Sequence, residues 1–221
     1  MCDSFAAMIR QLNESILREA SAWLAERDEA LARVLALYGH PPLWRREPSF
    51  STLVHIILEQ QVSLASANAV FKRLCELANP LTPEALLRLP NEALRTAGLT
   101  RQKTAYVQGL AQCILRGELN LTVLEDLSDD EVRQALKRVK GIGDWTADIY
   151  LSECLLRPDI LPKGDIAMQE AFRAINKLPK RPCHAEFEQL TNHWRPWRSV
   201  GTRILWHFYL CERGRKFLSE E

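Results

Sequence analysis

The chain has 221 residues, of which 47% are hydrophobic, and its formal net charge is +1 at pH 7. This length can form one large domain or two modest lobes around a buried core. The nearly neutral charge gives no general signal for nucleic-acid binding, and no apolar stretch is long enough to span a membrane.

Helix-period patterning prevails along the chain, and strand-period patterning is almost absent. The first helical stretch, at 4–38, ends before the helix-breaking pair Pro41 and Pro42. The second contains two helices, at 50–77, with a turn at 60–63 between them. Further helices are expected at 82–89, 91–97, 100–115, 128–138, 144–155, 165–175, 184–193 and 198–213. The predicted fold class is therefore all-α.

The N-terminus and the cysteines both favour an intracellular protein. The first twenty residues lack the basic-then-apolar order of a signal peptide. Six cysteines are scattered with no close pair, so neither a zinc site nor a disulfide framework is indicated. They are Cys2, Cys75, Cys113, Cys154, Cys183 and Cys211.

A short turn at residues 140–143 lies between two apolar-periodic stretches. Glycine at Gly141 and Gly143 can supply positive φ angles and lets the backbone approach a ligand closely. The helix that follows begins with free N–H groups, which suit an anionic oxygen such as a DNA phosphate. Basic residues precede the turn. An ordinary glycine-bearing helix connection would have the same two glycines.

Asp165 stands at the start of a predicted helix, directly after Lys163 and Gly164. An aspartate in this place is a good helix N-cap. The helix dipole also keeps such a carboxylate ionised, which suits a group that stabilises a cation or activates water. The N-cap and catalytic interpretations are compatible, and the residues alone leave both open.

Two adjoining passages resemble a known family. VKGIGDWTADIYL at 139–151, followed by ILPKGDIAMQEAF at 160–172, resembles the hairpin, loop and aspartate of the helix-hairpin-helix DNA glycosylase superfamily, also called HhH-GPD. Within it, the chain is similar to the AlkA-like DNA-3-methyladenine glycosylases. Residues 50–74, 97–106 and 194–199 resemble the helix pair that probes the duplex, a second DNA-facing turn and a late aromatic segment of that family.

The resemblance implies a two-lobed helical fold with the active-site cleft between the lobes. We expect one lobe from residues 1–48 plus 166–221, and a central lobe from residues 49–165 that contains the helix-hairpin-helix at 136–151. The AlkA-like family often has an additional N-terminal β-rich lobe, which the helical pattern before Phe50 cannot supply.

The implied activity is that of a monofunctional DNA glycosylase in base excision repair. It would flip alkylated purines, 3-methyladenine and 7-methylguanine, out of the duplex and hydrolyse the N-glycosidic bond. Asp165 would stabilise the cationic sugar, activate water, or both. Bifunctional relatives have a nucleophilic lysine where this chain has Trp145, so no Schiff base and no lyase activity are expected.

The base pocket implied by the resemblance is aromatic. The indoles of Trp145 and Trp197 would attract a cationic alkylated base, and core packing is the alternative for both. Further pocket walls are Ile149, Phe50 and Ser63. Gln61 would enter the base stack in place of the flipped nucleotide, unless it is simply an exposed turn residue.

The implied partner is double-stranded DNA with alkylated bases, bound by a monomer. No cofactor is required, and Cys211 alone after Cys183 predicts no iron-sulfur cluster. A structural Na⁺ or K⁺ ion is expected on the main-chain carbonyls of Lys137, Val139 and Ile142. DNA phosphates are expected to contact Lys140, Gly141, Gly143, Thr146, Gly98, Thr100 and Lys103. Basic clusters lie at 72–73, 101–103, 137–140, 177–181 and 195–203.

Two other functions stay open at this point. A glycosylase with the same skeleton could act on oxidised, mismatched or deaminated bases, although this would require more hydrogen-bonding groups in the pocket. A non-catalytic helix-hairpin-helix module could bind DNA structure or a repair partner. The sequence leaves the range of lesions undetermined.

Overall fold

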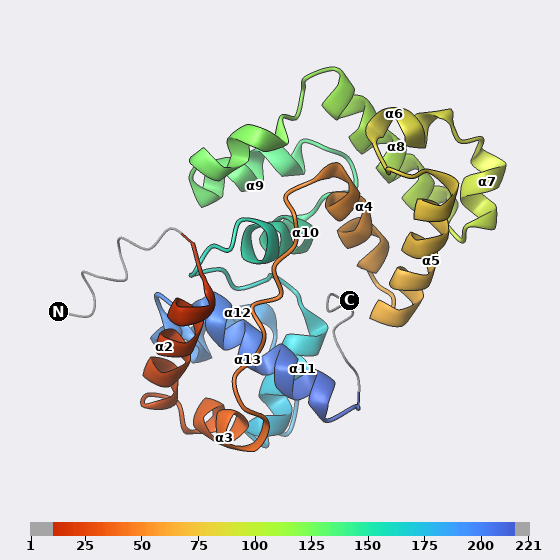
Figure 1. The fold of residues 1–221 in the computed structure, drawn as a ribbon. Coiled ribbons are helices and arrows are strands. Elements are labelled where there is room, and N and C mark those ends of the chain that lie inside the picture. The colour runs from red at the N-terminus through yellow and green to blue at the C-terminus, as the bar shows by residue number, and fades with distance from the viewer. Residues whose placement is uncertain (1–10, 215–221) are drawn as a thin grey trace. The chain divides into compact units, whose positions relative to one another are not determined.

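The computed structural model describes residues 11–214, which form helices and loops without a strand (Figure 1). The all-α prediction is confirmed for this part of the chain, whereas Cys2 and residues 4–10 of the first expected helix lie outside it. The helices are α2 (Glu14–Ala25), α3 (Glu29–Tyr38), α4 (Phe50–Glu59), α5 (Leu64–Leu77), α6 (Pro83–Arg88), α7 (Asn91–Thr96), α8 (Arg101–Leu115), α9 (Asp129–Lys137), α10 (Asp144–Ile149), α11 (Ile166–Ile175), α12 (His184–Leu190) and α13 (Arg198–Cys211), with short helical turns η1 (Leu121–Asp126), η2 (Tyr150–Cys154) and η3 (Asn192–Trp194).

The chain divides into two compact units. Unit 1 comprises Met1–Arg45 and Leu151–Glu221, and unit 2 comprises Arg46–Tyr150. The first boundary lies three residues before the expected one, but the second lies fifteen residues before it, so the expected division after residue 165 differs from the observed one. The segment 151–165 belongs to unit 1 because its backbone is bound there: the Ile160 N–H donates to Ser199 Oγ at 2.9 Å, and Ser199 Oγ donates to the Arg157 carbonyl at 2.6 Å.

Unit 2 contains α4 to α10, and hydroxyl side chains begin most of its helices. Ser49 caps α4, Thr82 caps α6 and Thr100 caps α8, each by accepting a backbone N–H bond in the first turn. Ser128 and Glu131 form a capping box at α9. Such caps stabilise a helix by about 1 kcal/mol each. Apolar positions of these helices fill the core, including Leu53, Ile57, Leu74, Leu86, Leu94, Val107 and Leu110, each with no exposed surface.

Unit 1 is built from α2, α3 and α11 to α13. Phe172, Phe187 and Trp194 pack edge to face, with ring centroids 5.0 to 6.1 Å apart. Gly201 lets α13 approach this cluster, since an added Cβ would lie 2.4 Å from Trp194. The core of unit 1 thus contains an aromatic cluster among mainly aliphatic side chains such as Leu17, Leu24 and Leu31.

A fully buried arginine, Arg203, lies within unit 1 on α13. Its guanidinium donates to the carbonyls of Ser152, Leu43 and Ser199 at 2.7, 2.9 and 3.0 Å. Burial lowers its pKa to about 10, so the group stays charged at neutral pH. One member of the basic cluster at 195–203 is thus a structural residue and not part of a basic surface.

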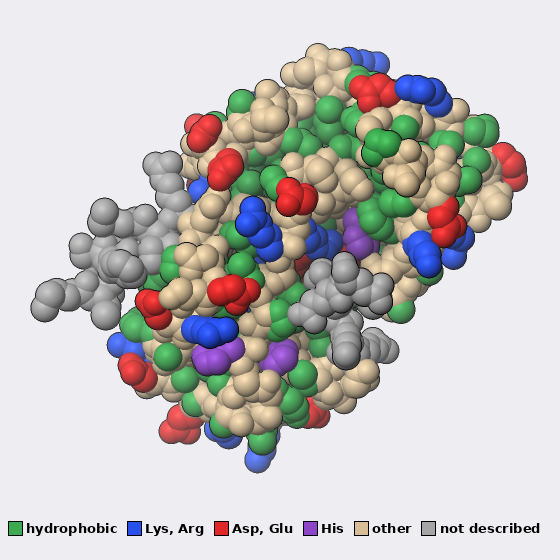
Figure 2. Space-filling view, in the orientation of Figure 1, with side chains coloured by type: hydrophobic (Ala, Val, Ile, Leu, Met, Phe, Trp, Pro, Cys, Tyr) green, Lys and Arg blue, Asp and Glu red, His purple; other side chains and the backbone are tan. Residues whose placement is uncertain are grey.

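The surface has mixed charge. Figure 2 shows acidic and basic side chains interspersed on the visible face, with no large patch of a single sign. Among the described residues, no helix has the length and apolar character needed to cross a membrane.

Candidate active site and DNA-facing turns

The predicted hairpin joins α9 to α10 in unit 2. Gly141 has φ of +100°, and an added Cβ would lie 2.3 Å from Cγ of Tyr106. Gly143 has φ of −102°, and an added Cβ would meet nothing within 4 Å. A positive φ is therefore confirmed for Gly141, and the same expectation is wrong for Gly143, whose backbone conformation other residues can adopt. Open space beside Gly143 leaves the backbone accessible to a ligand.

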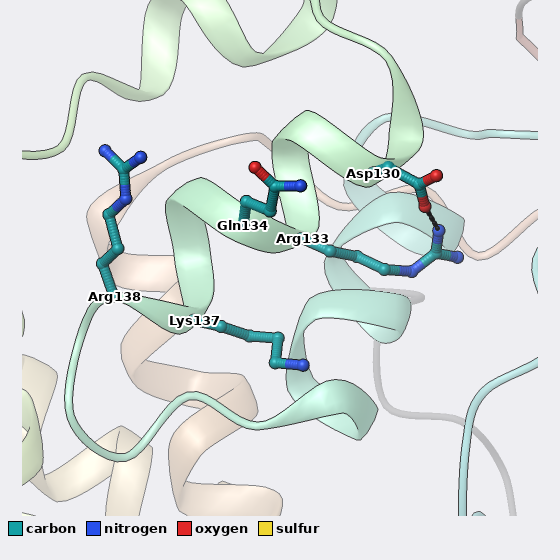
Figure 3. Close-up of a pocket in the computed structure, with 5 residues that line it drawn as sticks. All are labelled: Asp130, Arg133, Gln134, Lys137 and Arg138. Atoms are coloured by element: carbon teal, nitrogen blue, oxygen red, sulfur yellow. Dashed lines mark hydrogen bonds and ion pairs between the residues drawn. The ribbon is translucent and has the colours of Figure 1, made fainter.

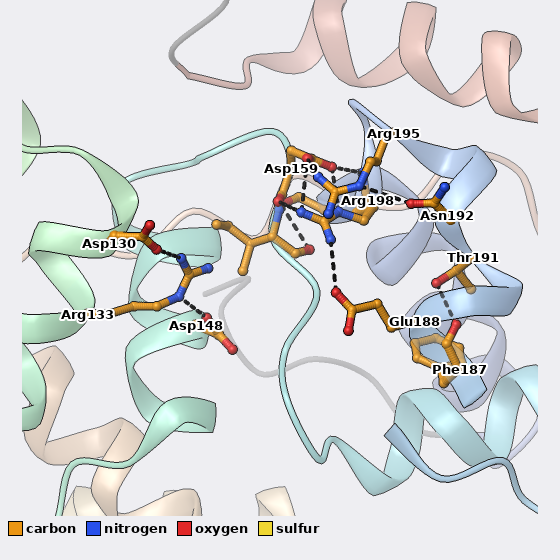
Figure 4. A network of polar contacts seen from close by, with 12 residues as sticks. Asp130, Arg133, Asp148, Asp159, Phe187, Glu188, Thr191, Asn192, Arg195 and Arg198 are labelled. Carbon is orange, nitrogen blue, oxygen red and sulfur yellow. Dashed lines mark hydrogen bonds and ion pairs between the residues drawn. The ribbon is translucent and has the colours of Figure 1, made fainter. Parts of the chain in front are cut away.

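Ion pairs brace the two helices of the hairpin. Arg133 on α9 donates to the buried Asp148 on α10 at 2.8 Å and to Asp130 at 3.1 Å (Figure 4), and Lys137 pairs with Asp144. A shallow groove of about 480 Å³ on α9 is lined by Asp130, Arg133, Gln134, Lys137 and Arg138 (Figure 3). It contains no aromatic side chain, so it does not match the pocket expected for a flipped base. Arg133 and Lys137 thus have carboxylate partners, and Arg138 and Lys140 are further exposed cations near the turn.

The turn between α4 and α5 presents the predicted stack-entering residue. Gln61 is exposed and has φ of +57°, an uncommon conformation for a residue with a side chain. Val62 beside it is 46% exposed. Ser63 caps α5 by accepting the Ser66 N–H at 3.2 Å. A strained residue at an exposed tip is a common feature of binding sites, so the geometry is compatible with the predicted role of Gln61.

Hydrogen bonds tie this turn to its neighbours. The Gln60 amide donates to the Gly141 carbonyl and to Thr146 Oγ1, both at 2.9 Å. The Lys103 ammonium donates to the carbonyls of Leu58 and Gln60 at 2.6 and 3.0 Å, and burial lowers its pKa. The side chains of Lys103 and of the buried Thr146 are therefore hydrogen-bonded inside unit 2. Their expected contact with phosphate stays a prediction.

The second DNA-facing turn precedes α8. Gly98 has φ of +105°, and an added Cβ would lie 2.8 Å from a guanidinium nitrogen of Arg73. Its N–H donates to the Arg95 carbonyl at 2.9 Å, so that N–H is not directed to phosphate. Thr100 is exposed and caps α8 through the Lys103 N–H at 3.2 Å.

Asp165 lies in unit 1 as the N-cap of α11. Its carboxylate accepts the Met168 N–H at 2.8 Å, and the residue is only 7% exposed. Gly164 before it has φ of +77°, which turns the loop into the helix. The N-cap interpretation is confirmed. A carboxylate fixed at a helix N-terminus in a mostly buried position also suits stabilisation of a positive charge.

An ion-pair network in unit 1 holds the loop that leads toward Asp165. Asp159 accepts from Arg198 at 2.7 and 3.0 Å and from Arg195 at 2.9 Å (Figure 4). Arg198 also donates to the Asp159 carbonyl at 2.8 Å. Trp197, between the two arginines, is 7% exposed. Sequence reasoning missed this network, because nothing in the spacing of Asp159 relates it to arginines 36 and 39 residues later.

Comparison with known proteins assigns the chain to a family. The model of the HhH-GPD superfamily of base excision DNA repair proteins matches residues 54–196, more than half of the chain. The chain belongs to this superfamily. DNA-3-methyladenine glycosylase 1 of Schizosaccharomyces pombe is 27% identical over 198 residues, covering 86% of each chain. Endonuclease III of Sulfolobus acidocaldarius is 31% identical over 171 residues, covering 76% of this chain and 73% of that one.

A solved structure supports the same assignment of the fold. The S. pombe 3-methyladenine DNA glycosylase in complex with abasic DNA superposes with a TM-score of 0.80 and 28% sequence identity. The match covers 85% of this chain and 95% of that chain. The fold is therefore the all-helical HhH-GPD fold, as the resemblance implied.

The residues expected to line the base pocket of this HhH-GPD protein are distributed over both units. Trp145 and Ile149 stand four residues apart on α10 and so share a face of that helix; Trp145 is half-buried, and Ile149 is 2% exposed. Phe50 is the first residue of α4, and Ser63 follows its other end, so about 13 Å of helix separates them. Their place in a base pocket stays a prediction.

The carbonyls expected to bind a cation lie in the HhH-GPD hairpin. The Val139 carbonyl accepts the Ile142 N–H at 3.1 Å, which leaves one of its two lone pairs for another partner. Carbonyl oxygens are ligands suited to hard cations. Among residues 11–214, no group of three or more His, Cys, Asp or Glu side chains is placed to hold a metal ion.

Proposed function

We propose that the protein is a monofunctional DNA glycosylase that excises alkylated purines, with 3-methyladenine and 7-methylguanine as substrates. The observation that carries this proposal is Asp165, a mostly buried carboxylate fixed at a helix N-terminus in a member of the HhH-GPD superfamily. The names of the curated relatives, among them DNA-3-methyladenine glycosylase 1, support this class of substrate.

The chemistry requires little more than one carboxylate. Alkylation at a ring nitrogen makes the purine cationic and already a good leaving group, so strong protonation by the protein is unnecessary. As the base departs, positive charge develops at C1′ of the sugar. A carboxylate at the position of Asp165 stabilises that charge and orients the attacking water. The indoles of Trp145 and Trp197 bind the cationic base through their faces, by about 0.5 to 2 kcal/mol.

The absence of lyase activity follows from Trp145. An indole has no amine, so it cannot form a Schiff base with the sugar after base release. The alternative is a bifunctional enzyme for oxidised bases. It is retained because one relative of the chain is named endonuclease III and not 3-methyladenine glycosylase. Lys140 and Lys163 are both exposed, but neither occupies the position of Trp145.

Unit 2 supplies the proposed grip on DNA. The open backbone at Gly143 lets a phosphate approach the hairpin, and the exposed Lys140 and Thr100 add contacts from neighbouring turns. Gln61 enters the base stack. A monovalent cation on the carbonyls of Lys137, Val139 and Ile142 would bridge the hairpin to phosphate. No other cofactor is proposed. The protein is proposed to act on DNA inside the cell.

A lesion panel tests the proposal. Purified protein is incubated with duplexes that each contain 3-methyladenine, 7-methylguanine, 8-oxoguanine, uracil or hypoxanthine, and free base and strand cleavage are both measured. We expect release of the two methylated purines with the strand left intact until alkali is added. Release of 8-oxoguanine alone, or borohydride trapping of a covalent complex, would replace the proposal with a bifunctional glycosylase. DNA binding without release of any base would support a non-catalytic module.

A further inference from the structure

Gln60, which carries none of the predicted functions, connects two of the DNA-facing turns. Its amide nitrogen donates to the Gly141 carbonyl in the hairpin and to Thr146 Oγ1 at the start of α10, both at 2.9 Å. Its backbone directly precedes Gln61. One side chain therefore joins the phosphate-binding hairpin to the turn that enters the base stack.

The beginning of α8, within the second DNA-facing segment at 97–106, contacts both of the other turns. Lys103, in the first turn of α8, donates to the Leu58 and Gln60 carbonyls at the C-terminus of α4. Tyr106, one turn further along α8, packs against Gly141 so closely that no Cβ fits there. The hairpin, the turn at 60–63 and the first two turns of α8 thus contact one another within unit 2, and Gln60 takes part in two of these three contacts.

The conformation of Gln61 explains why such bracing is needed. A positive φ in a residue with a side chain is unfavourable and persists only where the surroundings hold it. The turn at 60–63 is otherwise exposed at Gln61, Val62 and Ser63. Insertion into a base stack requires unstacking a base step. A flexible turn would deform instead of separating the bases, so the turn has to be rigid.

We propose that Gln60 is a positioning residue that fixes the Gln61 turn to the hairpin, so that the phosphate grip and the inserted side chain act as one rigid element. This inference rests on the proposed glycosylase function. It assigns Gln60 no contact with the base or the sugar. Its effect on excision therefore passes through Gln61.

A double-mutant cycle tests that dependence. Gln60→Leu keeps the approximate volume and removes the donor, and Gln61→Ala removes the inserted side chain. The single-turnover rate of 7-methylguanine excision is measured at saturating protein, together with the Kd for undamaged duplex. We expect Gln60→Leu to lower the rate about tenfold, the scale of one to two lost hydrogen bonds, with Kd changed less than about twofold. The double variant is expected to be no slower than Gln61→Ala alone.

Multiplicative losses in the double variant, an equal loss in Kd, or a wild-type rate for Gln60→Leu would overturn the proposal. Gln134→Leu, at an exposed position on α9, is the matched control and is expected to keep the wild-type rate. If Gln60→Leu does not fold, Thr146→Val removes one of the two acceptors and is expected to lower the rate by a smaller factor, again masked by Gln61→Ala.

A second readout separates this inference from the proposed function. 2-Aminopurine opposite an abasic analogue reports unstacking by fluorescence without any base release. Wild type is expected to raise the fluorescence and Gln60→Leu to raise it less, even if no methylated purine is released. Equal fluorescence with both proteins would refute the role of Gln60, whatever the lesion panel shows.

Discussion

The DNA-facing turns of unit 2 and the loop before Asp165 in unit 1 are held by different kinds of contact. In unit 2, the Gln60 amide binds a carbonyl and a hydroxyl, and Lys103 binds carbonyls. In unit 1, the loop is held by ion pairs of Asp159 with Arg195 and Arg198. The contacts that join the turns of unit 2 are made to carbonyls and a hydroxyl, although ion pairs brace α9 against α10. The loop of unit 1 is held by ion pairs together with hydrogen bonds of Ser199.

The basic residues beside the two regions are engaged to different extents. Arg195 and Arg198 bind the Asp159 carboxylate, and Arg203 binds buried carbonyls within unit 1. These three members of the basic cluster at 195–203 therefore have intramolecular partners. In unit 2, Arg101, Arg138 and Lys140 stay exposed beside the turns. In the proposed function, unit 2 holds the DNA strand and unit 1 contains the proposed catalytic carboxylate of Asp165.

The largest effect on stability is expected at the hairpin glycines. Gly141→Ala forces a Cβ into the Tyr106 ring at a positive φ, which should lower the free energy of unfolding by about 3 kcal/mol. Gly143→Ala meets open space and should cost less than about 1 kcal/mol, while weakening DNA binding. Urea unfolding and duplex binding of both variants check this. Equal stability loss at the two positions would contradict the account of the hairpin.

The ion-pair network of unit 1 should give the next effect. Arg198→Met removes three short contacts to Asp159 from a side chain that is 12% exposed, and should lower the free energy of unfolding by about 2 kcal/mol. Arg195→Met is the matched control, since its side chain is 48% exposed and such pairs contribute less than about 1 kcal/mol. Similar losses in urea unfolding for both variants would show that the network does not hold the loop.

Salt dependence of DNA binding distinguishes the two regions directly. Lys140→Ala and Arg101→Ala in unit 2 should each reduce the slope of log K against log salt by about 1, the value for one lost phosphate contact. Arg195→Ala in unit 1 should leave the slope unchanged, because that arginine is paired with Asp159. A reduced slope for Arg195→Ala alone would reverse the assignment of DNA contacts.

The smallest effect concerns pH and His55 in unit 2. Burial lowers the pKa of this ring, which stacks on Phe71 and lies beside Glu59 and Asn68, although Glu59 opposes the shift. The unfolded chain therefore binds a proton more readily than the folded one below about pH 6.5. Stability should fall as the pH drops from 6.5 toward the lowered pKa. In His55→Gln the fall measured by thermal unfolding between pH 7.5 and 5 should be shallower; an equal fall would contradict this role.

The helices could be predicted from the sequence because their signals are local, whereas the two-lobed fold was implied by the family resemblance. Helical periodicity, Ser and Thr caps and the N-cap at Asp165 each depend on residues a few positions apart. The hairpin was identified from its resemblance to the same family. The sequence did not show why position 141 requires glycine. The reason is the ring of Tyr106, a residue 35 positions earlier, which leaves no space for a Cβ.

The parts that could not be predicted depend on distant pairs. Tandem glutamines at 60 and 61 look alike in the sequence, yet one side chain is bound inside unit 2 and the other is exposed. Lys103 resembled a phosphate ligand because its charge is visible in the sequence and its carbonyl partners are not. The observed boundary between the units differs from the expected one for a similar reason. The contact of Ser199 with the segment before Asp165 has no sequence signature.

Replacement of Asp165 by asparagine tests most directly whether unit 1 supplies the catalytic carboxylate while unit 2 binds the DNA. Asparagine can still accept the Met168 N–H bond, so α11 keeps its cap while the negative charge is lost. Single-turnover release of 7-methylguanine and the Kd for an abasic-analogue duplex are measured on the same preparation. The account predicts that the release rate falls at least about 100-fold while Kd changes less than about threefold. Release at the wild-type rate, or equal losses of release and binding, would contradict it.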